Sequence, residues 1–100
     1  MREYELYLVI DADAEEESVT TALERIGELI TAGDGQTRGE VIKVENRGKR
    51  RLAFPIRKVL ESQDVLFTFH APPQTLTEVE RVLKLDEQVL RYLIVRTDED

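Results

Sequence analysis

The stretch YELYLVIDADAEEESVTTALERIGELI, residues 4–30, decides the fold, because its hydrophobic period changes from two to about 3.6 within it. The first part alternates, and one face of the resulting strand would carry Tyr4, Leu6, Leu8 and Ile10. Further on, apolar residues recur at helical spacings; they are Val19, Leu23, Ile26 and Ile30. The pattern predicts a strand over residues 4–11 and a helix over about 14–32, with Asp13 and Glu16 as a capping box at its start.

The rest of the chain supplies three more strands and a second helix. Strand patterns cover residues 40–46, 50–56, 65–71 and 88–96, a polar turn covers 59–64, and a helix covers 74–85 with Thr75 and Glu78 as its capping box. Gly48 separates the first two segments and predicts a bulge within one strand. Pro55 cannot donate a ladder hydrogen bond, so it predicts that this strand lies at a sheet edge.

The order strand, helix, strand, strand, helix, strand is that of an α+β ferredoxin-like βαββαβ sandwich. Two helices would cover one face of a four-stranded antiparallel sheet, and right-handed crossovers give the strand order 4-1-3-2. No repeat or linker interrupts the pattern. Residues 1–96 are therefore predicted to form a single ferredoxin-like domain, and residues 97–100 a short, frayed acidic C-terminal tail.

One face of such a sheet has no helix over it, and in a protein that works alone this face is polar. Here the residues predicted to point outward from the first and last strands are partly apolar: Tyr7, Val9, Leu93 and Val95. The two strands are neighbours in the predicted order, so these side chains would form one apolar patch. Such a patch is typical of a surface that binds a protein partner.

Residue types needed for catalysis or metal binding are scarce. The chain has no cysteine, and His70 is its only histidine, which excludes disulfides, thiolate chemistry and multi-histidine metal sites. The side chains of Glu15–Glu17 would project about 100° apart around a helix and cannot converge on an ion. We expect no catalytic residue, no metal and no cofactor. No apolar run approaches the ~20 residues of a membrane span, and no signal-peptide pattern opens the chain, so we expect a cytoplasmic protein.

The segment NRGKRRLAFPIRK, residues 46–58, carries six of the 14 basic residues and no acidic one, in a chain with 21 acidic residues and a net charge of −7. An edge strand projects alternate side chains about 6.6–7 Å apart, which roughly matches the phosphate spacing of one nucleic-acid strand. Arginine also binds phosphate through two parallel hydrogen bonds. The segment therefore predicts a phosphate-binding ribbon. The alternative is a solvated edge strand whose charges discourage aggregation.

The sequence gives less support to three other functions that occur in the same fold. An RNA recognition motif needs aromatic residues on the open sheet face, and the face of Phe67 and Phe69 is not fixed by the sequence, while the glycine-and-aromatic signature is absent. An acylphosphatase would need an arginine-bearing glycine loop after the first strand, where residues 11–17 read DADAEEE. The remaining alternative is a small-ligand regulatory domain that forms a homodimer through its open face.

Three segments together resemble the bacterial small-subunit ribosomal protein number six family: MREYEL (1–6), GKRRLAFPIRK (48–58) and LKLDEQVLRYLIVR (83–96). Their order and spacing cover nearly the whole chain and make the resemblance specific. It implies a structural constituent of the small ribosomal subunit, located in the cytoplasmic ribosome, with no enzyme activity, no small-molecule substrate and no membrane. It further implies binding to the central domain of small-subunit rRNA together with ribosomal protein number eighteen, which would occupy the open sheet face.

The resemblance also implies which residues contact RNA. They are Arg2, Arg47, Lys49, Arg50, Arg51, Arg57, Lys58 and Arg91. The motif match is the main support for Arg2, Arg50, Arg51 and Arg91, whereas Arg47 and Lys49 rest more on local charge. Two departures stand out. Phe54 occupies a position where the family has a tyrosine, and Ser62 with Gln63 stands where it often has glycine and tyrosine. Neither departure alters the basic cluster.

Overall fold

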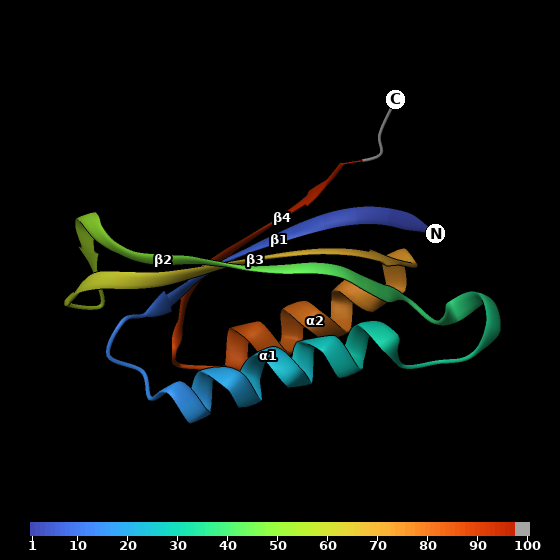
Figure 1. The fold of residues 1–100 in the computed structure, drawn as a ribbon, viewed down its shortest axis with the longest axis horizontal. Helices are drawn as coiled ribbons and strands as arrows, with labels where there is room; N and C mark the ends of the chain where they lie inside the picture. The colour runs from blue at the N-terminus through green and yellow to red at the C-terminus, as the bar shows by residue number, and fades with distance from the viewer. Residues whose placement is uncertain (98–100) are drawn as a thin grey trace.

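The computed structural model describes residues 1–97 and consists of two layers, a sheet and a pair of helices that cover one of its faces (Figure 1). Its elements are β1 (Arg2–Asp11), α1 (Glu16–Thr31), a short 3₁₀ turn η1 (Gly35–Thr37), β2 (Glu40–Ile56), β3 (Val59–Ala71), α2 (Pro73–Leu85) and β4 (Val89–Arg96). The predicted order of strands and helices is confirmed. Neither α1 nor α2 is long and apolar enough to cross a membrane.

The sheet is antiparallel with the order β2-β3-β1-β4, which is the predicted order 4-1-3-2 read from the opposite edge. β1 and β3 therefore occupy the centre, and β2 and β4 form the two edges. Pro55 lies in β2, at an edge as predicted. The ferredoxin-like fold class is confirmed, and one face of the sheet, called the open face below, has no helix against it (Figure 1).

The core lies between the sheet and the helices. The alternating residues of β1 are buried as predicted, with Tyr4, Leu6, Leu8 and Ile10 at most 4% exposed. The helices add Val19, Ile26 and Ile30 from α1 and Val79 and Leu83 from α2. Phe67 and Phe69 belong to this core and are 2% and 0% exposed. They face the helices and cannot stack on a base, which removes the RNA-recognition-motif alternative.

Both predicted capping boxes are wrong. α1 begins at Glu16 with Glu15 as its N-cap, and neither α1 nor α2 has a side-chain hydrogen bond at its N-cap. The backbone N–H of Asp13 instead donates to Asp11 Oδ1, at 2.9 Å, within the turn that leaves β1. α2 begins at Pro73, because proline at the first helical position needs no hydrogen-bond acceptor and already has a helical φ.

The turn between β2 and β3 lies at Arg57 and Lys58, so the polar turn predicted at residues 59–64 is wrong. Ile56 pairs with Val59 across this two-residue loop. Arg57 and Lys58 have φ values of 50° and 66°, as both central residues of a type I′ turn require. Asparagine and glycine favour that turn, and neither is present here. Residues 59–64 therefore extend β3, and the third strand begins earlier than its polar sequence predicts.

β2 is irregular in ways that shape the surface. The predicted bulge at Gly48 is confirmed by a register shift and a φ of 82°. A larger irregularity follows, because Arg51 pairs with Glu61 and the next pair is Ile56 with Val59. Residues 52–55 thus lie opposite the single residue Leu60. We call residues 51–61 the hairpin arm; it extends past the end of β1 at one end of the molecule (Figure 1).

The described chain ends in contact with β1. Thr97, the first residue of the predicted acidic tail, donates its hydroxyl to Glu3 Oε2 at 2.7 Å and its backbone N–H to the carbonyl oxygen of Glu3 at 3.0 Å. Thr97 is therefore held against the sheet. The rest of the predicted tail, residues 98–100, lies outside the described residues.

Candidate nucleic-acid interface

The basic segment occupies one end of the sheet edge. Lys49, Arg50 and Arg51 lie in β2 opposite Gln63, Ser62 and Glu61 of β3. Arg57 and Lys58 form the turn, and Arg47 lies in the bulge before Gly48. The structure therefore brings all six predicted cations of this segment onto one continuous stretch of backbone.

These cations point to both sides of the strand. Ser62 lies two residues from Asp64, which pairs with Val9 on the open face, so Arg50 opposite Ser62 also lies on the open face. Lys49 and Arg51 alternate to the other side. They keep the predicted two-residue spacing of about 6.6–7 Å. In this part of the predicted phosphate-binding ribbon, Lys49 and Arg51 therefore lie on one side of β2 and Arg50 lies on the other, on the open face.

The six cations differ in how far they are already engaged. Within residues 1–97, Lys49, Arg51 and Lys58 make no ion pair. Arg47 Nη1 lies 3.7 Å from Glu45 Oε2, a long contact on a carboxylate that Lys43 also holds, at 2.8 Å. Four of the six cations are therefore free, or nearly free, to meet a phosphate.

Arg57 is used inside the protein. Its Nη2 donates to the carbonyl oxygen of Val89 at 2.6 Å and its Nη1 to that of Glu87 at 3.3 Å. Val89 is the first residue of β4 and Glu87 lies in the turn before it, so Arg57 holds the tip of the hairpin arm against the far edge of the sheet. Its predicted role in RNA contact competes with this structural role.

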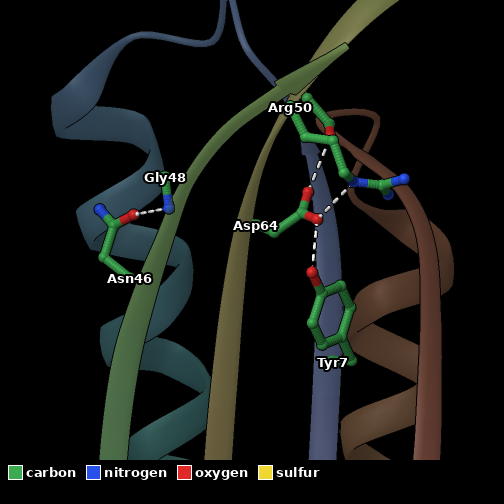
Figure 2. A network of polar contacts seen from close by, with 6 residues as sticks. Tyr7, Asn46, Gly48, Arg50 and Asp64 are labelled. Atoms are coloured by element: carbon green, nitrogen blue, oxygen red, sulfur yellow. Dashed lines mark hydrogen bonds and ion pairs between the residues drawn. The ribbon is translucent and has the colours of Figure 1, made fainter. Parts of the chain in front are cut away.

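Arg50 is held by a buried acid. Its Nε donates to Asp64 Oδ2 at 2.9 Å, and Asp64 is 1% exposed (Figure 2). The same oxygen accepts a hydrogen bond from the Tyr7 hydroxyl at 2.6 Å, and Oδ1 accepts one from Ser62 Oγ at 2.7 Å. Residues from β1, β2 and β3 therefore meet at one carboxylate on the open face.

These contacts set the ionisation of the network. Burial alone would raise the pKa of the Asp64 carboxyl, but hydrogen bonds from Tyr7, Ser62 and Arg50 and the charge of Arg50 outweigh it, and the pKa lies below its ordinary value. The hydrogen bond to Asp64, with burial and the nearby negative charge, raises the pKa of Tyr7. At neutral pH the network therefore holds an ionised carboxylate and a neutral phenol.

Arg91 joins Arg50 on the open face. It lies in β4 opposite Val9, and it lines a pocket of about 150 Å³ with Arg50 and with residues 52–54 and 56 of the hairpin arm. Phe54, on this part of the arm, is 81% exposed. A second arginine and an exposed aromatic ring thus stand beside Arg50, although 41 residues separate Arg50 from Arg91 in the sequence.

Arg2 lies elsewhere. It pairs with Ala71 at one end of β3, whereas Arg50 pairs with Ser62, nine residues along the same strand. Nine residues of strand span about 30 Å. Of the eight predicted RNA-contact residues, the structure therefore gathers seven around the hairpin arm and leaves Arg2 at the opposite end.

The predicted partner face is only partly apolar and exposed. Leu93 and Val95 are 62% and 44% exposed and stand on β4 opposite Tyr7 and Glu5. Tyr7 is half-buried, with its hydroxyl on Asp64. The expected exposure of Val9 is wrong: it is 8% exposed, because the hairpin arm packs beside it. The accessible apolar strip is thus Leu93 with Val95.

Sequence reasoning missed Asp64, Ser62 and the exposure of Phe54. Asp64 fell within the predicted polar turn, so its place in a central strand was hidden. The available signal was periodic: Asp64 has the same parity as Leu66 and Thr68 in the strand pattern that follows it. No metal-binding group of acidic or histidine side chains is found within residues 1–97.

Comparison with known proteins gives a consistent result. The family model described as ribosomal protein S6 matches residues 3–96. A small ribosomal subunit protein bS6 from Moorella thermoacetica is 42% identical over 100 residues, which cover 100% of this chain and 98% of the relative. A bS6 protein from Caldanaerobacter subterraneus subsp. tengcongensis is 40% identical over 99 residues, which cover 99% of this chain and 100% of the relative.

A solved structure agrees in fold. The crystal structure of 30S ribosomal protein S6 from Thermotoga maritima superposes with a TM-score of 0.84 at 27% identity and covers 96% of this chain and 87% of that one. The family model spans nearly the whole chain, and the identities lie well above the level at which only a fold is shared. The chain therefore belongs to the ribosomal protein S6 family of the small ribosomal subunit.

Proposed function

We propose that this chain binds the central domain of small-subunit rRNA together with ribosomal protein number eighteen. As a member of the S6 family, it is a structural protein of the small subunit of the cytoplasmic ribosome. The observation that supports the proposal is the concentration of unpaired cations around the hairpin arm of a chain whose net charge is −7. An exposed apolar strip on the open face lies beside them.

The RNA surface in this proposal is the end of the molecule that carries the hairpin arm. Lys49, Arg51 and Lys58 supply unpaired positive charge on the edge. On the open face, Arg91 and the terminal amino groups of the Asp64-bound Arg50 are the donors available to RNA. Arg47 and Arg57 contribute with part of their hydrogen-bonding capacity already used. Arg2 would meet a separate stretch of RNA about 30 Å away. Contacts of this kind position RNA by its backbone and shape.

The partner surface is the strip formed by Leu93 and Val95 on β4 and bordered by Tyr7. Exposed apolar side chains on an uncovered sheet face lose contact with water when a partner covers them. Since Arg91 lies on the same strand, two residues from Leu93, the partner and the RNA would meet along β4. This arrangement favours joint binding of the two.

The test is binding to a central-domain rRNA fragment across a salt series, with and without ribosomal protein number eighteen. The Arg50→Ala/Arg51→Ala variant should lower the slope of log affinity against log salt by about 0.7–0.9 for each lost phosphate contact. The matched control, Arg25→Ala/Arg81→Ala, removes the same charge from α1 and α2 and should leave the slope unchanged.

Two results would contradict the proposal. Equal effects of the two double variants would mean that net charge, not the hairpin arm, governs binding. Absence of RNA binding at any salt concentration, together with a stable homodimer, would instead support a small-ligand regulatory domain.

A further inference from the structure

Asp64 is unusual for its surroundings. It lies inside β3 with Leu66 two residues away on the same face, and its cross-strand neighbour on β1 is Val9. Both neighbours are buried, and so is Asp64, at 1% exposed. A buried carboxylate is unfavourable unless it is paired and hydrogen-bonded, and an apolar residue of similar size would pack here without that cost. Packing alone therefore does not account for an acid at this position.

The hydrogen bonds to Asp64 together fix the position of the Arg50 guanidinium. Tyr7 and Ser62 hold the two carboxylate oxygens in place, at 2.6 and 2.7 Å, and Arg50 Nε binds Oδ2 at 2.9 Å. The contact uses Nε, so the two terminal amino groups of Arg50 extend past the carboxylate (Figure 2). The Arg50 side chain is 51% exposed. One edge of the planar guanidinium is thus fixed, and its end remains open to solvent.

We propose that Asp64 is a positioning residue that fixes Arg50 so that its two terminal amino groups form a preorganised site for one phosphate group of the bound RNA. A guanidinium free to rotate would lose its side-chain freedom on binding, whereas one already held loses less. Arg91 lines the same pocket as Arg50 and adds a second positive charge to the site. The inference rests on the proposed RNA-binding function.

The direction in which Asp64→Asn changes RNA affinity distinguishes positioning of Arg50 from a simple effect of charge. Asp64→Asn removes a negative charge from the RNA surface, so charge alone predicts tighter binding. Positioning predicts weaker binding, because the neutral amide holds Arg50 less firmly. We expect affinity for the central-domain rRNA fragment, with the partner protein present, to fall about tenfold, as for a single charge-assisted hydrogen bond.

A double-mutant cycle with Arg50 then excludes a general loss of structure. In the Arg50→Ala background, Asp64→Asn should cause no further loss of affinity, because there is no guanidinium left to position. A loss of the same size in both backgrounds would mean that Asp64 only supports the fold, and it would overturn the inference. Unchanged or tighter binding of the Asp64→Asn single variant would do the same.

A pair of arginine-to-lysine variants gives a test that does not depend on the folding of the Asp64 variant. Arg50→Lys keeps the charge, but its three donors share one nitrogen, so it lacks the planar pair of terminal amino groups that can meet a phosphate while Nε binds Asp64. It should lose about tenfold in affinity. The matched control Arg25→Lys, on α1 outside the proposed RNA surface, should stay within about twofold. Equal losses would overturn the inference.

Nuclear magnetic resonance of the free chain tests the positioning itself. The Arg50 Nε–H signal should exchange with solvent more slowly than that of Arg51, and Tyr7→Phe should speed it up. If Arg50 and Arg51 exchange alike, the positioning inference fails while the RNA proposal stands. If the chain binds no rRNA fragment at all, both fail, and slow Arg50 exchange would then mark a purely structural ion pair.

Discussion

In the cluster around Asp64, burial of the carboxylate opposes its ionisation and hydrogen bonds favour it. Its carboxylate is nearly inaccessible to water, yet it accepts hydrogen bonds from a phenol, a hydroxyl and a guanidinium. Hydrogen bonds to a charged acceptor contribute about 1.5–3 kcal/mol each, which is enough together to offset a large desolvation cost. The three donors therefore decide whether an acid is tolerated at this position.

The lowered pKa of Asp64 predicts a pH-dependent contribution to stability. Its folded-state pKa lies below the unfolded value of about 4. The stabilisation is therefore complete above pH 4 and is lost as the pH falls through the lower, folded-state pKa. We expect Asp64→Asn to reduce the free energy of unfolding by about 2 kcal/mol at pH 7, and this difference from wild type to shrink towards pH 2.

Urea unfolding at several pH values between 7 and 2 measures this difference. Glu78→Gln is the control, since Glu78 forms an exposed ion pair with Arg81 on α2. Such a pair contributes at most about 1 kcal/mol. A gap between wild type and Asp64→Asn that stays constant with pH would show that the ionised carboxylate is not what stabilises the fold.

The residues of this cluster mark the limit of sequence reasoning about the site. Alternation in β1 was sufficient to place Leu6 and Leu8 in the core, because that pattern is local. The partners of Asp64 are not local: Tyr7 is 57 residues away and Arg50 is 14. Sequence could identify Arg50 as a cation of the ribbon. Only the strand register reveals that a buried acid already holds it.

The hairpin arm is the element that departs most from the sequence prediction, and the cause is the turn. Type I′ turns favour asparagine and glycine, which are absent at Arg57 and Lys58. The prediction followed the polar residues 59–64 instead. The helices were predicted to within two residues because their apolar stripes extend over several turns, but their caps were not, since cap residues depend on where the chain enters the helix.

Left-handed backbone at the turn predicts a stabilising substitution. Lys58 has a φ of 66°, a conformation that costs a side-chain-bearing residue about 1–2 kcal/mol. Glycine adopts it freely but loses about 0.5–1 kcal/mol more conformational entropy on folding. Lys58→Gly should therefore raise the free energy of unfolding by about 0.5–1 kcal/mol. Thermal unfolding should show a rise in Tm of a few degrees.

Lys49→Gly is the matched control for the turn. Lys49 lies in the ladder opposite Gln63, and its φ is not in the left-handed region. Glycine there only weakens the strand and should lower the free energy of unfolding by about 0.5–1 kcal/mol. Both variants remove one lysine, so the change in net charge is the same in both and cannot explain a difference between them. Changes of the same sign in the two variants would mean that the turn stores no strain.

At the scale of the whole molecule, the dimensions are large compared with the distance over which exposed charges interact in salt solution. The molecule measures 42 × 31 × 20 Å, and the screening length at physiological salt is about 8 Å. Acidic residues that lie several screening lengths away therefore contribute little to the field at the hairpin arm. An acidic protein can in this way present one basic end, and its overall charge disfavours contact with RNA elsewhere on its surface.

The open face gives the last prediction, because it carries exposed apolar side chains beside the basic end. Leu93 is 62% exposed on β4, and Leu85 is 75% exposed at the end of α2 on the helical layer. Leu93→Gln should weaken binding of ribosomal protein number eighteen by about tenfold, which corresponds to the loss of one well-buried apolar contact. Leu85→Gln removes an even more exposed leucine from the opposite layer and should leave affinity unchanged.

Calorimetric titration of the two proteins without RNA measures both variants directly. Neither leucine is buried in the free chain, so both variants should keep their free energy of unfolding within about 0.5 kcal/mol of wild type. Any loss of affinity then reports on the interface and not on folding. If Leu93→Gln binds as wild type does while Leu85→Gln is impaired, the partner lies on the helical layer. In that case the apolar strip beside Arg91 has some other occupant, and RNA and partner would not meet along β4.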